Sequence, residues 1–293
     1  MGIARSVRAT ATRMRGVHVS RDRRDEYFRL LATARRAGYE LLGLEEFQRR
    51  AASEGRDWHA LALRHDVDIR DVEGNEAFHA VERAIGARST SYFRACTAGA
   101  HASLILRLLR DGFEVGYHYE EGATIAKWRG LASREAVEEL RDEVVALFRH
   151  NCAEFRRRWN PGLSSIAAHG DWINGRLGFA NHAFVTPQLL SEEGLRFEAY
   201  DADFLGQFDV YVSDAARYPD AWANGYGIAE AIRDGRRRIC LLTHERRWHA
   251  NLGAGLAADV RRAADGTRYG WNRRRSARGR RSGTSDMPRE TCR

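Results

Sequence analysis

Cysteine and long apolar runs are scarce in this chain of 293 residues, and each scarcity excludes a class of protein. The four cysteines show no C-x-x-C spacing, so we expect neither a disulfide framework nor a cysteine zinc site, and a reduced, cytoplasmic setting fits best. No apolar run approaches the roughly 20 residues that span a bilayer, which argues against a membrane-spanning segment. Residues 1–24 contain arginines but no apolar stretch typical of a secretory signal.

Lysine is also scarce, because Lys127 is the only one and every other basic residue is arginine. The net charge of +8 is concentrated at the two ends of the chain. Residues 1–24 hold seven Arg and one Asp, and residues 272–293 hold eight Arg and two acidic residues, which leaves −4 for residues 25–271. Arginine-rich ends can supply non-specific affinity for nucleic acid. The mildly acidic middle and the lack of a DNA- or RNA-binding motif favour no specific nucleic-acid partner.

The composition, with 43% hydrophobic and 30% charged residues, is ordinary for a soluble globular protein. The length allows one domain of barrel size, which we place at residues 25–271. Residues 1–24 form a basic extension in this interpretation. Residues 272–293 are rich in Arg, Ser and Gly without apolar periodicity, so we expect a disordered tail that is dispensable for folding.

Short apolar runs alternate with segments of helical periodicity along the chain. We expect strands at 39–42, 61–64, 89–94, 113–117, 164–168, 196–200, 208–213 and 239–243. We expect helices at 25–36, 44–52, 72–85, 101–110, 132–159, 187–193, 228–234 and 252–264. This alternation predicts an α/β fold with a parallel sheet, either open or closed into a barrel.

Acidic and histidine side chains follow several of these strands directly. Asp66 and Asp68 follow the strand that begins at Leu61, His118 follows the strand at 113–117, and His244 follows the last strand. In parallel α/β folds the carboxyl ends of the strands meet at one edge, where active sites collect. Any one of these residues, taken alone, is explained as an ordinary helix cap or as a histidine whose hydrogen bonds are satisfied. Their occurrence together, at the ends of several strands, is what indicates an active site.

This inventory of side chains suits metal-assisted hydrolysis. Asp and His are ligands for a divalent metal such as zinc, and a catalytic site keeps three protein ligands and an open position for water. A further carboxylate can act as general base and a further imidazole as general acid. An amide or an ester is the natural substrate for such a site.

Four segments, taken together and in this order, resemble the successive motifs of polysaccharide deacetylase-like proteins. These proteins form the NodB-homology group, carbohydrate esterase family 4, and this chain is similar to the branch with an H-D-V-D motif. The segments are RHDVD at 64–68, STSYFR at 89–94, GFEVGYHYE at 112–120 and LTH at 242–244. The resemblance implies a distorted, TIM-barrel-like (β/α) barrel of one domain, a divalent metal, and hydrolytic removal of an acyl group, usually acetyl, from a sugar.

The same resemblance implies a role for each matched residue. Asp66 corresponds to the general base, and His244 corresponds to the acid that protonates the leaving group. Asp68 and His118 correspond to metal ligands. The family's second metal histidine lies four residues beyond the first, where this chain has Gly122, so His169 is the best candidate for the third ligand. The family's third motif, which contains an arginine, has no clear match.

Several other polar and aromatic residues are candidates for a role at this site. His65 can orient a carboxylate or be structural, and Glu120 and Glu121 are expected on a solvated face. Trp172 and Trp248 are expected to pack at the core or rim, although either could stack on a sugar. His249 is an alternative to His244.

The sequence therefore predicts a metal-dependent hydrolase that removes an acyl group, N-acetyl by expectation, from a carbohydrate or sugar-linked precursor. Cleavage of a carbon–nitrogen bond other than a peptide bond is the expected reaction. The alternative is a catalytically degenerate barrel that binds a glycan, since Gly122 replaces a metal histidine of the family.

Overall fold

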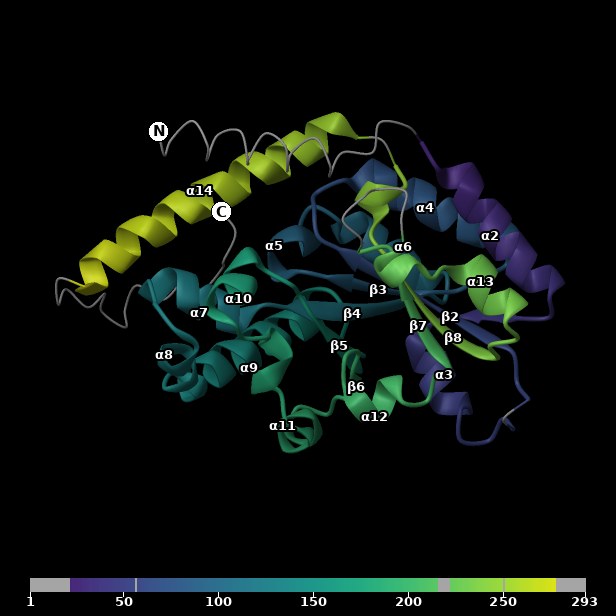
Figure 1. Cartoon of the computed structure of the whole chain (residues 1–293), viewed down its shortest axis with the longest axis horizontal. Helices are drawn as coiled ribbons and strands as arrows, with labels where there is room; N and C mark the ends of the chain where they lie inside the picture. Colours follow the sequence, from purple (N-terminus) through teal and green to yellow (C-terminus); the bar gives the residue numbers. More distant parts are fainter. Residues whose placement is uncertain (1–21, 56, 216–221, 250, 278–293) are drawn as a thin grey trace. The chain divides into compact units, whose positions relative to one another are not determined.

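The computed structural model describes residues 22–277, apart from residues 56, 216–221 and 250 (Figure 1). These residues form two compact units that interleave along the chain. The first unit comprises the described residues up to Ser91, together with Arg110–Glu114 and Leu205–Asp259. The second unit comprises Tyr92–Leu109, Val115–Phe204 and the described residues from Val260 onward. Among the helices in these ranges, none is long and apolar enough to cross a membrane.

The first unit is built on four parallel strands. Strand β2 pairs with β1 and with β8, and β8 pairs with β7. The strands are β1 (Glu40–Leu42), β2 (Ala60–Val67), β7 (Val210–Ser213) and β8 (Arg238–Thr243). The helices are α2 (Arg24–Arg36), α3 (Leu44–Arg50), α4 (Val72–Ile85), α13 (Ile228–Arg233) and the short η2 (Ala223–Gly225) and η3 (Glu245–Arg247). Apolar side chains of β2, β8, α2 and α4 form its core, among them Leu61, Leu241, Leu31 and Phe78.

The second unit contains three parallel strands, with β5 paired to both β4 and β6. They are β4 (Glu114–Tyr119), β5 (Ser165–Ala168) and β6 (Phe197–Glu198), and β3 (Thr90–Phe93) contains the boundary between the units. The helices are α5 (Ala95–Ala98), α6 (Ala102–Arg110), α7 (Glu121–Arg129), α8 (Arg134–Glu138), α9 (Arg141–Arg158), α10 (Trp172–Leu177), η1 (Asn181–Phe184), α11 (Pro187–Glu192) and α12 (Ala202–Leu205). The last helix, α14 (Leu252–Ala277), begins in the first unit and belongs to the second from Val260 onward.

The predicted α/β fold, with parallel strands joined by helices, is confirmed. The single helix predicted at 132–159 is instead two helices, α8 and α9, with Glu139 and Leu140 between them. The predicted cap at its start is correct, because the Ser133 hydroxyl accepts a hydrogen bond of 3.3 Å from the backbone N–H of Ala136. The predicted domain limits, 25–271 for the barrel and 1–24 for the extension, stay predictions, although Arg24 already belongs to α2.

Helix α7 was not predicted, and the expectation that Glu120 and Glu121 lie on a solvated face is wrong. Both side chains are buried, and so is every residue of α7 from Glu121 to Ala126. A helix that is buried on all sides has no alternation of apolar and polar positions. Its sequence therefore lacks the periodic stripe from which a helix is predicted.

The expected start of the tail at Asn272 is also wrong, because α14 extends to Ala277. The amide of Asn272 donates to the carbonyl of Lys127 at 3.1 Å, and the hydroxyl of Ser276 donates to the carbonyl of Arg129 at 2.6 Å. The last carbonyls of a helix have no partner within it. The C-terminal part of α14 thus caps α7, and these contacts order residues that lack an apolar pattern. Residues 278–293 lie outside the described part.

The packing of α14 on α7 predicts a difference between two glycines that end helices. Gly130 ends α7 and Gly178 ends α10, both with positive φ. A Cβ at Gly130 would lie 2.3 Å from the backbone nitrogen of Arg273, whereas a Cβ at Gly178 would meet nothing within 4 Å. We expect Gly178→Ala to lower the free energy of unfolding by about 1 kcal/mol, the cost of the left-handed backbone. Gly130→Ala should cost about 2–4 kcal/mol, because overpacking adds to it.

Urea denaturation of the two variants measures this difference. Equal losses of stability would show that α14 does not pack against Gly130 in solution.

Candidate active site

Two charged side chains of β2 form a buried ion pair in the first unit. Arg64 and Asp66 lie on the same face of the strand because they are two residues apart. The Arg64 guanidinium donates from Nε to Oδ1 of Asp66 at 2.8 Å and from a terminal nitrogen to Oδ2 at 2.9 Å. Both side chains are almost fully buried. An arginine in this bidentate position favours the ionised form of the carboxylate.

The register of β2 and β8 brings the two predicted catalytic residues to neighbouring positions. His65 pairs with Thr243 in this parallel ladder, so Asp66 and His244 follow at the same level on adjacent strands. The sequence placed Asp66 beyond a strand, whereas it lies inside β2, one residue before the strand ends. This register places Asp66 and His244 near each other within the first unit, and their catalytic roles stay predictions.

Asp214 holds His244 in place from the end of β7. Its Oδ1 lies 2.7 Å from Nδ1 of His244, and its Oδ2 accepts from the backbone N–H of His244 at 2.8 Å. The indole N–H of Trp248 donates to the same Oδ2 at 2.9 Å. This geometry places the Nδ1 proton toward Asp214 and leaves Nε2 as the nitrogen that exchanges a proton.

His244 is largely protonated at neutral pH. Burial acts to lower its pKa, but the Asp214 carboxylate outweighs this effect and, with Asp68 and Asp66, raises the pKa of His244 to about 9. Nε2 of His244 lies 4.0 Å from Oδ2 of Asp68, which a terminal nitrogen of Arg246 also approaches at 3.5 Å. A protonated imidazole beside carboxylates is suited to donate a proton to a leaving group.

Two roles were expected for His65, orienting a carboxylate of the site or a structural role, and its contacts support the structural one. Its ring contacts Oε1 of Glu82 at 2.7 Å and the Thr243 hydroxyl at 2.6 Å. Glu82 also accepts from Tyr27 and Ser89, so a buried polar network ties α4 to β2 and α2. Burial acts to raise the pKa of Glu82, but these partners, His65 foremost, lower it to about 2.

The alternative acid, His249, serves a different carboxylate. Its Nδ1 lies 3.2 Å from Oδ2 of Asp71, whose Oδ1 caps α4 and accepts from Asn251. Of the two histidines considered for the acid role, His244 is the one whose contacts suit it. Trp248 is buried against Tyr27 and Phe78, as expected of a packing residue.

The second unit holds the two histidines that were predicted as metal ligands. His118 lies at the end of β4 and His169 follows β5, and their rings meet edge to face with centroids 5.1 Å apart. Nδ1 of His118 donates to the carbonyl of Ala167 at 2.9 Å, and Nδ1 of His169 lies 3.3 Å from Oε2 of Glu120. With both Nδ1 atoms turned to protein oxygens, both rings offer Nε2 as the basic nitrogen, which suits a metal.

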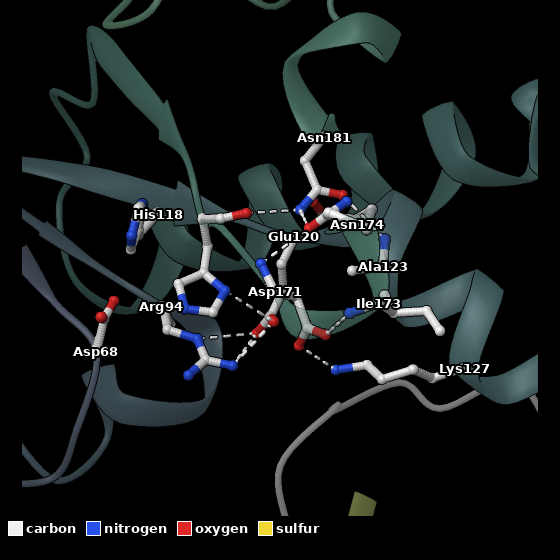
Figure 2. Close-up of polar contacts among 12 residues, drawn as sticks. Asp68, Arg94, His118, Glu120, Ala123, Lys127, Asp171, Ile173, Asn174 and Asn181 are labelled. Atoms are coloured by element: carbon white, nitrogen blue, oxygen red, sulfur yellow. Dashed lines mark hydrogen bonds and ion pairs between the residues drawn. The ribbon is translucent and has the colours of Figure 1, made fainter. Parts of the chain in front are cut away.

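Glu120 is held as a carboxylate by Arg94. The guanidinium donates to Oε1 from Nε at 3.0 Å and from a terminal nitrogen at 2.6 Å, and the same terminal nitrogen donates to Oε2 at 2.8 Å (Figure 2). Burial acts to raise the pKa of Glu120, but the charge of Arg94 and the contact with His169 hold it well below its usual range. Glu120 therefore faces His169 as an anion.

Lys127 forms another ion pair close to His169. Its ammonium donates to Oδ2 of Asp171 at 2.6 Å, while Oδ1 of Asp171 caps α10 by accepting from the backbone of Ile173. Glu120, His169 and Asp171 each offer a ligand atom within 4.8 Å of the others. Because Arg94 and Lys127 already neutralise the two carboxylates, a cation bound by this trio would meet two positive charges. The trio therefore does not fit a metal site of its own.

The position of the family's second histidine has no room for a side chain. A Cβ at Gly122 would lie 2.8 Å from a ring carbon of Phe184, 2.9 Å from Oδ1 of Asn181 and 3.1 Å from a ring carbon of Phe179. Oδ1 of Asn181 accepts from the backbone N–H of Ala123, and its amide group donates to the carbonyl of His169 at 2.7 Å. Side chains that hold the His169 loop thus occupy the space that an imidazole at residue 122 would need.

The structure thus groups the predicted residues by unit. Asp66, Asp68 and His244 belong to the first unit, and His118 and His169 belong to the second. That Asp68, His118 and His169 share one metal stays a prediction. Asp214 was missed, although an Asp directly after a strand was the signal used elsewhere in the chain. Arg64 and Arg94 stood within recognised motifs, but nothing in the sequence identified the carboxylate that each one binds.

The comparisons with known proteins give structural neighbours only. No protein-family model matches the chain, and no curated protein matches it. Among solved structures, peptidoglycan deacetylase PdaC from Bacillus subtilis is 12% identical with a TM-score of 0.39, and the match covers 77% of this chain and 96% of that chain. A proposed polysaccharide deacetylase from Mycobacterium smegmatis is 14% identical with a TM-score of 0.37, and the match covers 78% and 95%.

A third neighbour is a mutant of BA3943, described as a CE4 family pseudoenzyme with restored enzymatic activity. It is 12% identical with a TM-score of 0.39, and the match covers 73% of this chain and 64% of that chain. These neighbours are polysaccharide deacetylases or members of the CE4 family, the family that the sequence resembles. At these identities and TM-scores they establish no activity for this chain.

The contact between Asp214 and His244 predicts a pH dependence. The folded-state pKa of about 9 lies above the ordinary value of 6.5, so the stability from protonated His244 is full below about pH 6.5. That stability is lost as pH rises through about 9. In Asp214→Asn the pKa of His244 should fall by about 1–3 pH units, because the opposing charge is removed.

An NMR titration of the His244 ring measures this pKa. Asp209→Asn, which changes a carboxylate of the same unit that binds the backbone of Arg237 and Arg238, should leave it unchanged. A value that stays near 9 in Asp214→Asn would show that another group holds the proton on His244.

Proposed function

We propose that this protein is a metal-dependent hydrolase that removes an acyl group, N-acetyl in the first place, from a carbohydrate or sugar-linked precursor. The observation that carries the proposal is the pairing of an ionised carboxylate with a protonated imidazole on neighbouring strands. Arg64 keeps Asp66 as a carboxylate, and Asp214 raises the pKa of His244 to about 9. A general base and a general acid are what hydrolysis of an amide requires.

The two residues divide the proton transfers of the reaction. Asp66 accepts a proton from the attacking water as the water oxygen forms its bond to the acyl carbon. His244 then donates its Nε2 proton to the departing nitrogen as the carbon–nitrogen bond breaks, which yields acetate and a free amino sugar. Asp214 holds the His244 ring in the orientation that this transfer needs.

A divalent metal, zinc in the first place, fits the donors that the sequence predicts for it. His118 and His169 both offer Nε2, and Asp68 offers a carboxylate, which together are the borderline and hard ligands that zinc accepts. When bound, such a metal lowers the pKa of water and polarises the acyl oxygen. The metal and its ligand set are part of the proposal.

A glycan-binding protein without catalysis is the second candidate, and Gly122 favours it. The position has no room for the second metal histidine of the family that the sequence resembles. A chain that lacks this ligand would bind its sugar without hydrolysing it. Release of acetate by the purified protein separates the two candidates.

We expect metal-loaded wild-type protein to release acetate from at least one member of a panel of N-acetylated sugars and sugar nucleotides. Asp66→Asn, which is nearly isosteric, should slow this release by about 10²–10⁴-fold, because the base is lost. His244→Ala should act similarly, and least on substrates with good leaving groups. Circular dichroism checks that both variants fold. Binding of a panel member without release of any acyl group by the wild type would refute the hydrolase and support the glycan-binding protein.

The proposed metal ligands are tested by measuring the metal content of the purified protein. Purified wild-type protein should carry close to one divalent metal per chain, measured by elemental analysis, and His118→Ala should lose most of it because an imidazole ligand is removed. His150→Ala provides the control, since that exposed histidine lies on α9 of the same unit. Equal metal content in wild type and His118→Ala would remove His118 from the ligand set.

A further inference from the structure

Two neighbouring glutamates at the start of α7 have different surroundings, although both are buried. Glu121 accepts from the hydroxyl of Tyr117 and from the amide of Asn151 at 2.8 Å, so neutral groups surround it. Glu120 is paired with Arg94 and lies 3.3 Å from Nδ1 of His169. Only Glu120, of these two, can act on the histidine.

The backbone of the His169 loop is fixed independently of its ring. The N–H of His169 donates to the carbonyl of Tyr119 at 2.8 Å, and its carbonyl accepts from Asn181 at 2.7 Å. Two residues further on, Asp171 caps α10 and binds Lys127. The remaining freedom of His169 is the rotation of its ring and the choice of which nitrogen carries the proton.

Glu120 restricts both of these freedoms. A carboxylate 3.3 Å from Nδ1 attracts a proton to that nitrogen, so Nε2 becomes the basic atom. The two oxygens of Glu120 divide their contacts, because Oε1 takes two hydrogen bonds from Arg94 while Oε2 takes one and faces His169 (Figure 2). Arg94 therefore fixes the plane of the carboxylate that His169 meets.

We propose that Glu120, held by Arg94, is a positioning residue that fixes His169 as an Nε2 ligand in place of the histidine that cannot fit at residue 122. This inference rests on the proposed function for its metal. It explains why Glu120 is buried against the partly buried Arg94 in a chain where Phe184 and Asn181 occupy the space beside Gly122. A carboxylate behind a ligating histidine orients the ring and raises the basicity of the ligand atom.

The test compares Glu120→Gln with Glu121→Gln, which changes the same residue type, equally buried, one position away. Zinc affinity is measured by competition with a chelator. Glu120→Gln should bind zinc about 10–100-fold more weakly, as loss of such a partner typically does. Glu121→Gln should stay within about threefold of the wild type, well under that effect. Equal affinities for the two variants would overturn the proposal.

A second measurement uses protein without metal. Long-range ¹H–¹⁵N NMR spectra report which ring nitrogen of His169 carries the proton. The wild type and Glu121→Gln should hold it on Nδ1, and Glu120→Gln should show a mixture of both forms. An unchanged Nδ1 proton in Glu120→Gln would overturn the positioning role, and this result is separate from whether the protein is a hydrolase.

The double variant Arg94→Met, Glu120→Gln covers the case in which Glu120→Gln fails to fold, because it leaves no buried charge without a partner. It should show the same loss of zinc affinity and the same mixture at His169. Wild-type zinc affinity in the double variant would count against the proposal.

Discussion

Burial of Arg64 and Asp66 side by side on β2 is the interaction on which the first unit depends. Taking two charges out of water costs several kcal/mol for each ion, and only close pairing with good geometry offsets this. The strand meets this requirement because residues i and i+2 share a face, so the fork of the guanidinium reaches both carboxylate oxygens. Any change to one partner leaves a charge that the surrounding core cannot solvate. Such a pair adds little net stability compared with apolar side chains of similar volume.

In the second unit, two carboxylates are likewise paired with basic side chains. Arg94 neutralises Glu120 and Lys127 neutralises Asp171, and both carboxylates flank His169. Burial acts to lower the pKa of Lys127, but the two carboxylates raise it above its usual value, so the ammonium stays charged. The only lysine of the chain thus lies where a compact ammonium must fit between an N-cap and a second carboxylate. The structure therefore gives Lys127 a role, as the partner of Asp171, that the composition of the chain did not reveal.

The fold could be predicted from the sequence because it follows local rules. Strand periodicity located the strands that carry Asp66 and His118 and the strand that His244 follows, although Asp66 and His118 lie within their strands rather than after them. Helix α7 was not predicted because a helix that is buried on every side has no apolar stripe in its sequence. The end of α14 was not predicted because polar side chains, rather than an apolar pattern, hold it in place. The partners of Arg64 and Arg94 escaped for another reason, since a charged side chain does not reveal which carboxylate it will meet. Asp214 could have been found by the rule that found Asp66.

Side chains near the end of α14 cap α7, so the hydrogen bonds of α7 are complete only after α14 has been synthesised. Asn272 and Ser276 reach the end of α7 across 145 and 147 residues of chain. While the chain is being made, α7 emerges long before these side chains, and its final carbonyls must remain bound to water until the end of α14 is available. The helix that carries Lys127 is thus among the last parts of the second unit to be completed. A protein interrupted before Asn272 would have all its predicted catalytic and metal-binding residues, but the carbonyls of Lys127 and Arg129 would lack their partners from α14.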